Sequence, residues 1–156
     1  MRNRKIVIAG GTGFIGRQVA KYFSATNHVV ILTRNVKGKN NAFADIDLND
    51  NPNIRLVYWN GKDTGEWSKE MNGADIIINL AGKSVNCRYN VKNRQEIFDS
   101  RTHATKAIGE AIRHSVAPPK LWINAASATI YRHAMDQPQD EFTGEYHDDF
   151  SVQVCK

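Results

Sequence analysis

The stretch KIVIAGGTGFIGRQVAKYF, residues 5–23, decides the fold because an apolar run, a glycine-rich turn and an amphipathic segment follow one another directly. Residues 5–9 form a short β-branched run, which is typical of a strand buried on both faces of a parallel sheet. After the turn, apolar residues recur at helical spacing until the polar segment SATN at 24–27. The sequence therefore predicts a strand, a tight turn and a helix in succession.

The turn carries glycines in the spacing GxxGxxG, and each glycine has a mechanical task. The first allows the tight turn, the second lets the backbone approach a pyrophosphate, and the third lets the helix pack closely on the strand. Free N–H groups and the positive dipole end of the helix suit phosphates. We predict a dinucleotide site, the alternative being a tight turn without a ligand. The residues expected to contact the cofactor here are Gly10, Thr12, Gly13, Phe14, Ile15 and Gly16.

Strand and helix patterns alternate along the rest of the chain. Further strands are predicted over residues 28–34, 54–59 and 74–82 and after the prolines at 118–119, with a short helical piece over 66–71 and a long helix over 92–113. Residues 35–53 are rich in Asn, Asp and Gly and predict a long loop. The alternation implies an α/β fold, a doubly wound parallel sheet of Rossmann type with about five strands, in one domain over residues 1–156.

The end of the second predicted strand indicates which dinucleotide is bound. An NAD site usually places an acidic residue there for the ribose 2′-OH, but this chain has Thr33 and Arg34 and no carboxylate before Asp45. Arg34 suits a 2′-phosphate through a planar, charge-assisted fork, and Lys37 adds positive charge. We therefore predict NADP in preference to NAD, the alternative being a solvated arginine at a strand end.

The third predicted strand is followed by YWNGK, residues 58–62. Trp59 and Asn60 are candidates for lining the adenine site, although Trp59 suits the core equally well.

The composition limits the classes of partner and location. The formal net charge is +5 and the pI is near 9.3, but Lys and Arg are scattered, without the basic stripe of a nucleic-acid-binding protein, so nucleic acid is an unlikely partner. The sequence contains no run of eighteen apolar residues and no signal peptide, which predicts a cytoplasmic protein without membrane contact. The two cysteines and five histidines lack metal-ligand spacing, so no metal site is expected.

Three segments resemble the motifs of the extended short-chain dehydrogenase/reductase superfamily, in the expected order. They are AGGTGFIG at 9–16, NLAG at 79–82 and NAASATIY at 124–131. The segments INLAGKSV, EIFDSRTHATKAIGEAI and DDFSVQVCK are more closely similar to an atypical branch of NAD(P)-dependent nucleoside-diphosphate-sugar epimerases or oxidoreductases. The resemblance implies cofactor contacts from Leu80, Ala81 and Gly82 and a small-molecule substrate, with nucleotide sugars as the suggested class.

The resemblance also implies that about half of the family architecture is present. The later strands and a small C-terminal substrate domain would be missing, and FSVQVCK at 150–156 reads as the first turns of a helix. An uncovered sheet edge could then pair with a second copy as a homodimer.

By the same resemblance, the family reaction uses a Tyr, a Lys four residues later and a Ser that positions the substrate oxygen. Ser127 matches that serine, with Thr129 in reserve, although Ser127 could simply cap the strand end. The Tyr/Lys pair has no counterpart. Tyr58 and Lys62 in YWNGK have its YxxxK spacing, but they lie at a strand end rather than on the terminal helix, so that match is a coincidence, since four-residue patterns are common. The terminal segment offers Ser151 with Cys155 at those positions, and a shift by one residue does not restore a Tyr or a Lys.

Arg101 stands in the apolar stripe of the long predicted helix, four residues after Ile97 and four before Thr105. The stripe is formed by Ile97, Phe98, Arg101, Ala104, Thr105, Ile108, Ala111 and Ile112. We hypothesise that Arg101 supplies a fixed positive charge near the nicotinamide or the substrate, since an arginine cannot act as a base. The alternative is a structural arginine paired with Glu96 or Asp99.

The sequence thus predicts the NADP-binding part of an epimerase or oxidoreductase, which by itself is expected to bind cofactor weakly and to catalyse nothing. The alternatives are a module that senses NADP(H) without chemistry and, less favoured, a basic nucleic-acid-binding domain.

Overall fold

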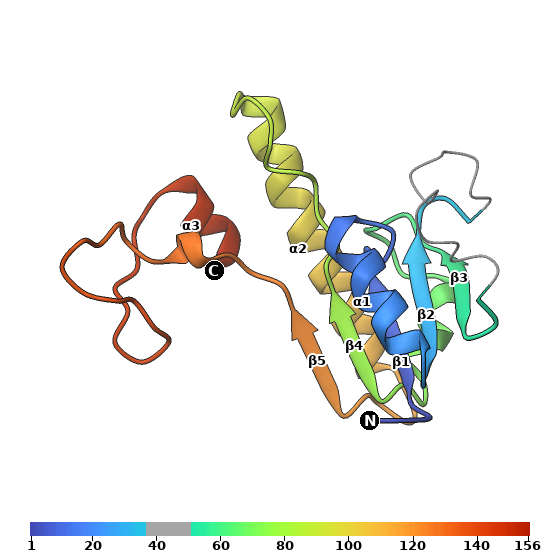
Figure 1. Ribbon diagram of the computed structural model, residues 1–156. Helices are drawn as coiled ribbons and strands as arrows, with labels where there is room; N and C mark the ends of the chain where they lie inside the picture. The colour runs from blue at the N-terminus through green and yellow to red at the C-terminus, as the bar shows by residue number, and fades with distance from the viewer. Residues whose placement is uncertain (37–50) are drawn as a thin grey trace.

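The structure is a computed structural model that describes residues 1–36 and 51–156. It contains a five-stranded parallel sheet in the order β3-β2-β1-β4-β5, flanked by helices (Figure 1). The elements are β1 (Lys5–Ala9), α1 (Phe14–Ser24), β2 (His28–Thr33), β3 (Ile54–Tyr58), the short helix η2 (Glu66–Met71), β4 (Ile76–Asn79), α2 (Val91–Arg113), β5 (Leu121–Asn124), the short helix η3 (Ala128–Ile130) and α3 (Phe150–Cys155). The predicted Rossmann-type α/β fold is confirmed. Most of the predicted loop over 35–53, including Lys37, lies outside the described residues.

The strand order creates a switch point between β1 and β4. The chain moves outward from β1 to β2 and β3, and then crosses back to continue on the other side with β4 and β5. In doubly wound sheets, ligands bind outside the carboxyl ends of the strands at such a point. The fold therefore locates the candidate site before any side chain is considered.

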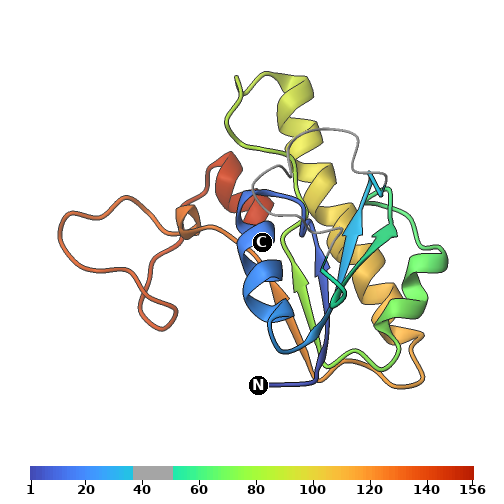
Figure 2. The same ribbon diagram turned by 45° about the vertical axis from the view of Figure 1, so that its right-hand side comes forward.

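Two apolar layers hold the helices on the sheet, because successive strand residues face opposite sides. Ile6 and Ile8 of β1 belong to the layer that includes Ala20 of α1, whereas Val7 belongs to the layer that includes Ile108 of α2. Figure 2 shows α1 on one face and α2 with η2 on the other. The long apolar stripe of α2 is narrower than predicted, since Phe98 is 38% exposed.

The C-terminal segment leaves the sheet after β5. All four residues of β5 are exposed, and residues 125–149 form an arm that extends away from the sheet (Figure 1). The chain returns in α3, where the Phe150 ring lies 5.8 Å from that of Tyr89 and 5.4 Å below the guanidinium of Arg94. The Asp149 side chain caps this helix by accepting from the Val152 N–H at 3.0 Å. The predicted helix start in the terminal segment is therefore confirmed.

Within residues 1–36 and 51–156, no helix has the length and apolar character needed to cross a membrane. In the same residues, no group of three or more His, Cys, Asp and Glu side chains is arranged to hold a metal ion.

Candidate cofactor site

A pocket of about 800 Å³ opens at the carboxyl ends of β1, β2, β3 and β4. It brings together most of the residues that the sequence predicted for cofactor binding. Those that line it are Gly10, Thr12, Gly13, Thr33, Arg34, Asn60, Leu80, Ala81 and Gly82. Phe14, Ile15 and Gly16, which the sequence also predicted, do not line it.

Backbone atoms lie too close to two glycines of the turn, Gly10 and Gly16, for either to carry a side chain. Gly10 has φ +75°, and a Cβ there would lie 2.8 Å from the carbonyl carbon of Leu80. A Cβ at Gly16 would lie 2.3 Å from the carbonyl oxygen of Gly10. Gly13 is less confined, and its N–H donates to the Gly10 carbonyl at 3.0 Å. The turn therefore brings bare backbone to the wall of the pocket.

Helix α1 begins directly at this turn. Gly13 is its N-cap residue, and no side chain of the described residues caps it. The first turn of an α-helix has N–H groups without intrahelical partners, and they carry the positive end of the helix dipole. This end of α1 is therefore suited to an anionic ligand in the pocket.

The ends of β2 and β3 form one side of the pocket. Thr33 pairs with Tyr58 in the parallel ladder, and the Trp59 N–H donates to the Thr33 carbonyl at 2.9 Å. Arg34 is exposed at this edge, beside the turn that contains Asn60. Trp59 is only 3% exposed and also lines the pocket, so it belongs to the core and to the pocket wall.

Helix α2 supplies a group of polar pocket residues that the sequence analysis did not identify. These residues are Glu96, Asp99, Ser100 and His103. They recur at intervals of three or four and so lie on one face of the helix. The spacing is visible in the sequence, but the sequence does not show that this polar face of α2, beside the apolar stripe, lines a pocket.

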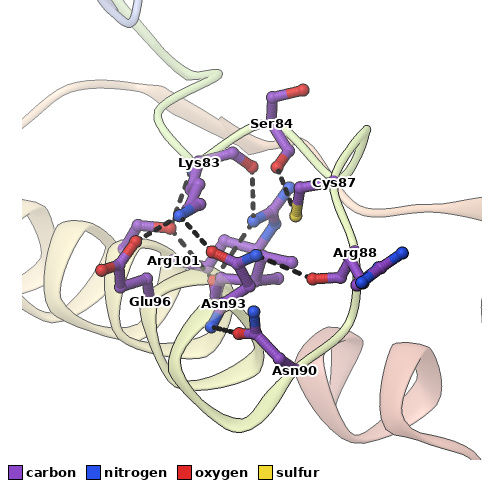
Figure 3. Close-up of polar contacts among 10 residues, drawn as sticks. Lys83, Ser84, Cys87, Arg88, Asn90, Asn93, Glu96 and Arg101 are labelled. Carbon is purple, nitrogen blue, oxygen red and sulfur yellow. Dashed lines mark hydrogen bonds and ion pairs between the residues drawn. The ribbon is translucent and has the colours of Figure 1, made fainter.

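An ion pair lines the pocket where the chain leaves β4 (Figure 3). Lys83 forms a salt bridge with Glu96, and its ammonium also donates to the Asn93 carboxamide at 2.9 Å. The hydrogen bond from Lys83 holds the pKa of the Glu96 carboxyl below its ordinary value. The backbone N–H of Lys83 donates to the Ser100 hydroxyl at 2.9 Å. These contacts tie the segment after β4 to α2.

Arg101 contributes to the same junction through backbone carbonyls. Its Nη1 donates to the Lys83 carbonyl at 3.1 Å and to the Ile97 carbonyl at 3.2 Å (Figure 3). A Cβ at Gly82 would lie 3.1 Å from the guanidinium carbon, so Gly82 makes room for this arginine. The partners are not the carboxylates considered from the sequence, because Glu96 pairs with Lys83 and Asp99 accepts from Gln95.

Asn79, the last residue of β4, connects this strand to β5. It is 4% exposed, its Oδ1 accepts from the Ala81 N–H at 3.1 Å, and its Nδ2 donates to the Asn124 carboxamide at 2.6 Å. A longer contact of 3.4 Å reaches the Thr105 hydroxyl. One buried amide thus joins β4, β5 and α2 beneath the pocket.

Ser127 and Thr129 lie past the end of β5, outside the pocket lining. The two hydroxyl oxygens are 2.9 Å apart, and the Ser127 Oγ accepts from the Thr129 N–H at 3.2 Å as the N-cap of η3. Both residues are exposed. Their hydroxyls are therefore accessible, while Ser127 also has the capping role considered from the sequence.

A parallel sheet in the order 3-2-1-4-5, with a glycine turn and an uncapped helix N-terminus at its switch point, defines the class of Rossmann-type nucleotide-binding folds. The model of the NAD dependent epimerase/dehydratase family matches residues 6–151. The chain belongs to this family.

Two curated relatives cover most of the chain. Epimerase family protein SSP1921 of Staphylococcus saprophyticus is 34% identical over 128 residues, which are 81% of this chain and 38% of that protein. Epimerase family protein YfhF of Bacillus subtilis is 30% identical over 146 residues, which are 93% of this chain and 45% of that protein. The chain thus spans less than half the length of these relatives.

Solved structures have the same fold. Human epimerase family protein SDR39U1, determined with NADPH, superposes with a TM-score of 0.74 and 23% identity, over 96% of this chain and 45% of that one. A UDP-N-acetylglucosamine 4-epimerase from Methanobrevibacter ruminantium, in complex with UDP-N-acetylmuramic acid, gives a TM-score of 0.79 with 18% identity, over 99% of this chain and 47% of that one.

Proposed function

We propose that this chain is the cofactor-binding domain of an epimerase or oxidoreductase, and that its cofactor is NADP. The observation that carries the proposal is the pocket at the switch point, which is lined by the glycine turn and by Arg34. The residues present fit the cofactor, since Gly13 offers backbone without a side chain to the pyrophosphate and Arg34 offers a cation to the 2′-phosphate. When bound, the nicotinamide supplies the hydride chemistry.

The preference for NADP is tested by titrating the chain with NADPH and NADH. We expect tighter binding of NADPH, and we expect the Arg34→Leu variant to lose about tenfold to hundredfold in NADPH affinity, as a charged hydrogen bond warrants. Binding of NADH should stay unchanged. Arg2→Leu is the matched control, because Arg2 precedes β1 at the opposite end of the sheet. Equal affinities of the unmodified chain for NADPH and NADH would refute this role of Arg34.

For the chemistry, the proposed residues are Ser127, which would position a substrate oxygen, Thr129 in reserve, and Arg101 as a fixed positive charge. The exposed hydroxyls support the first two roles, and the hydrogen bond from Arg101 to the carbonyl of the pocket residue Lys83 supports the third. The terminal helix carries Ser151 and Cys155, which lack the phenol and the ammonium group that the family reaction uses. The isolated chain is therefore expected to be inactive, and nucleotide sugars are the proposed substrates of the whole protein.

The role of Arg101 is tested in the whole protein with Arg101→Met and Arg101→Lys. An electrostatic role predicts a loss of kcat of about a hundredfold in the methionine variant, with partial rescue by lysine. Hydrogen exchange of residues 82–88 separates this from a structural role, because a purely structural arginine would loosen that segment in both variants. Unchanged cofactor binding and turnover in Arg101→Met would end the catalytic proposal.

A non-catalytic NADP(H) sensor is the second candidate. It is favoured because Ser151 and Cys155 stand at the positions expected for the catalytic Tyr and Lys. It would be supported if the whole protein bound NADPH but neither oxidised it nor epimerised, oxidised or reduced any nucleotide sugar.

Three further proposals concern the domain structure, the oligomeric state and the cellular location of the protein. Residues 1–156 would act as one domain, which a single cooperative unfolding transition would support. The exposed β5 edge would allow a homodimer, which light scattering after size exclusion would detect. The cytoplasmic location would be checked by cell fractionation.

A further inference from the structure

Lys62 lies on the same side of the pocket as Arg34, although the two residues are far apart in sequence. The parallel register pairs Thr33 with Tyr58, and the Trp59 N–H donates to the Thr33 carbonyl at 2.9 Å. The segments that follow β2 and β3 therefore leave the sheet side by side. Arg34 comes from the first segment and Lys62 from the second, and both line the pocket.

The turn that carries Lys62 is fixed by its own hydrogen bonds. The Asn60 Oδ1 accepts from the Lys62 N–H and from the Asp63 N–H, both at 3.0 Å. Gly61 has φ +88°, a conformation that a residue with a side chain rarely adopts. The backbone of Lys62 is therefore held in place, and only its side chain remains to be ordered by a ligand.

Two buried tryptophans anchor this turn to the core. The indole nitrogens of Trp59 and Trp67 both donate to the Asp63 carbonyl, at 3.0 and 2.9 Å. Each tryptophan is 3% exposed, and the ring centroids lie 4.8 Å apart. The position of Lys62 relative to β3 thus depends on core packing rather than on a free loop.

The charges around the two cations leave them available to an anion. Among residues 1–36 and 51–156, neither Arg34 nor Lys62 forms an ion pair or a hydrogen bond through its side chain. The two carboxylates that line the pocket come from α2, where Glu96 binds Lys83 and Asp99 accepts from Gln95. The carboxylate of Asp63, next to Lys62, is bound by the Asn60 amide at 2.8 Å.

We propose that Lys62 is a second cation for the 2′-phosphate of NADP, beside Arg34, and that it discriminates against NAD. The inference rests on the proposed NADP site. An arginine fork and a lysine ammonium are complementary, because the first binds two phosphate oxygens in a plane and the second acts as a compact point charge. NAD has only a ribose hydroxyl at this position and gains little from either cation.

The test measures the binding of two nucleotides that differ only in the 2′-phosphate, adenosine 2′,5′-bisphosphate and adenosine 5′-monophosphate, by calorimetry. We expect Lys62→Met to weaken binding of the bisphosphate about tenfold and to leave the monophosphate unchanged. Lys62→Arg should retain the preference, because the charge remains. Lys106→Met is the matched control, since Lys106 is an exposed lysine of α2 outside the pocket lining.

The outcomes separate this inference from the proposed function. If the unmodified chain prefers the bisphosphate and Lys62→Met keeps the full preference, Lys62 is not a ligand and the NADP site stands. Equal loss for both nucleotides would also overturn the assignment, because it would show that Lys62 does not act on the 2′-phosphate. If the unmodified chain binds the two nucleotides equally, the NADP preference fails and the Lys62 assignment fails with it.

Discussion

Gly16→Ala should lower the free energy of unfolding by about 3 kcal/mol, the upper range of ordinary overpacking costs. The new Cβ would lie 2.3 Å from the Gly10 carbonyl oxygen and 2.6 Å from the Gly11 Cα. Both neighbours are backbone atoms of the turn, which no side-chain rotation can move aside. In a helix, Ala is otherwise favoured over Gly by about 1 kcal/mol, so the steric cost must first cancel that gain. Urea titration of the variant measures the difference.

Gly65→Ala is the matched control for this substitution. Gly65 also precedes a helix, but a Cβ there would come no closer than 3.7 Å to any neighbour. Its φ of 176° is extended backbone that alanine adopts without strain. We expect its stability to equal that of the unmodified chain. Equal stability of Gly16→Ala and Gly65→Ala would mean that α1 can shift away from β1, and the packing argument for the third glycine would be wrong.

Periodicity predicted the bounds of β1 and α2 closely, and both elements are regularly buried on the side that packs on the core. Helix α2 was predicted over 92–113 and spans Val91–Arg113, and β1 has the predicted bounds Lys5–Ala9. Such elements could be predicted because one repeating pattern fixes both their type and their buried side. The width of the apolar stripe was less predictable, since Phe98 is 38% exposed although its neighbour Ile97 is buried.

The pocket wall was less predictable than the turn. The glycines could be predicted because a tight turn and a close backbone approach require residues without a side chain, and the spacing of such residues can be read from the sequence. By contrast, the polar face of α2 around Glu96 and His103 becomes part of the pocket only because α2 packs at a particular rotation. The carbonyl partners of Arg101 likewise depend on the path of the chain after β4.

Lys62 illustrates how position alters the meaning of a pattern. As the last residue of YWNGK it had the spacing of a catalytic lysine, and its place after a strand argued against that role. The same place brings it to the pocket. The sequence could not reveal this because the neighbour of the β3 end is set by strand order, and Arg34 lies far away along the chain.

Asn79→Leu should destabilise the protein by about 2–3 kcal/mol, because the change removes a buried amide while leaving its partners in place. The Ala81 N–H would lose its acceptor, and the Asn124 carboxamide would lose a donor at 2.6 Å. Leucine has as many side-chain heavy atoms as asparagine but is bulkier and offers no polar atom, so the loss combines the missing hydrogen bonds with a packing cost.

The same variant should also weaken NADPH binding, because the bond to the Ala81 N–H orients the chain from Leu80 to Gly82, which lines the pocket. Chemical denaturation gives the stability, and fluorescence titration gives the affinity. Asn86→Leu, at an exposed position between β4 and α2, is the matched control and should change neither.

The double variant Asn79→Leu/Asn124→Leu should lose less stability than the sum of the two single variants, since the second change removes the group that the first leaves unpaired. Strict additivity would show that the 2.6 Å contact contributes nothing, and the role of Asn79 as the link between β4 and β5 would have to be abandoned.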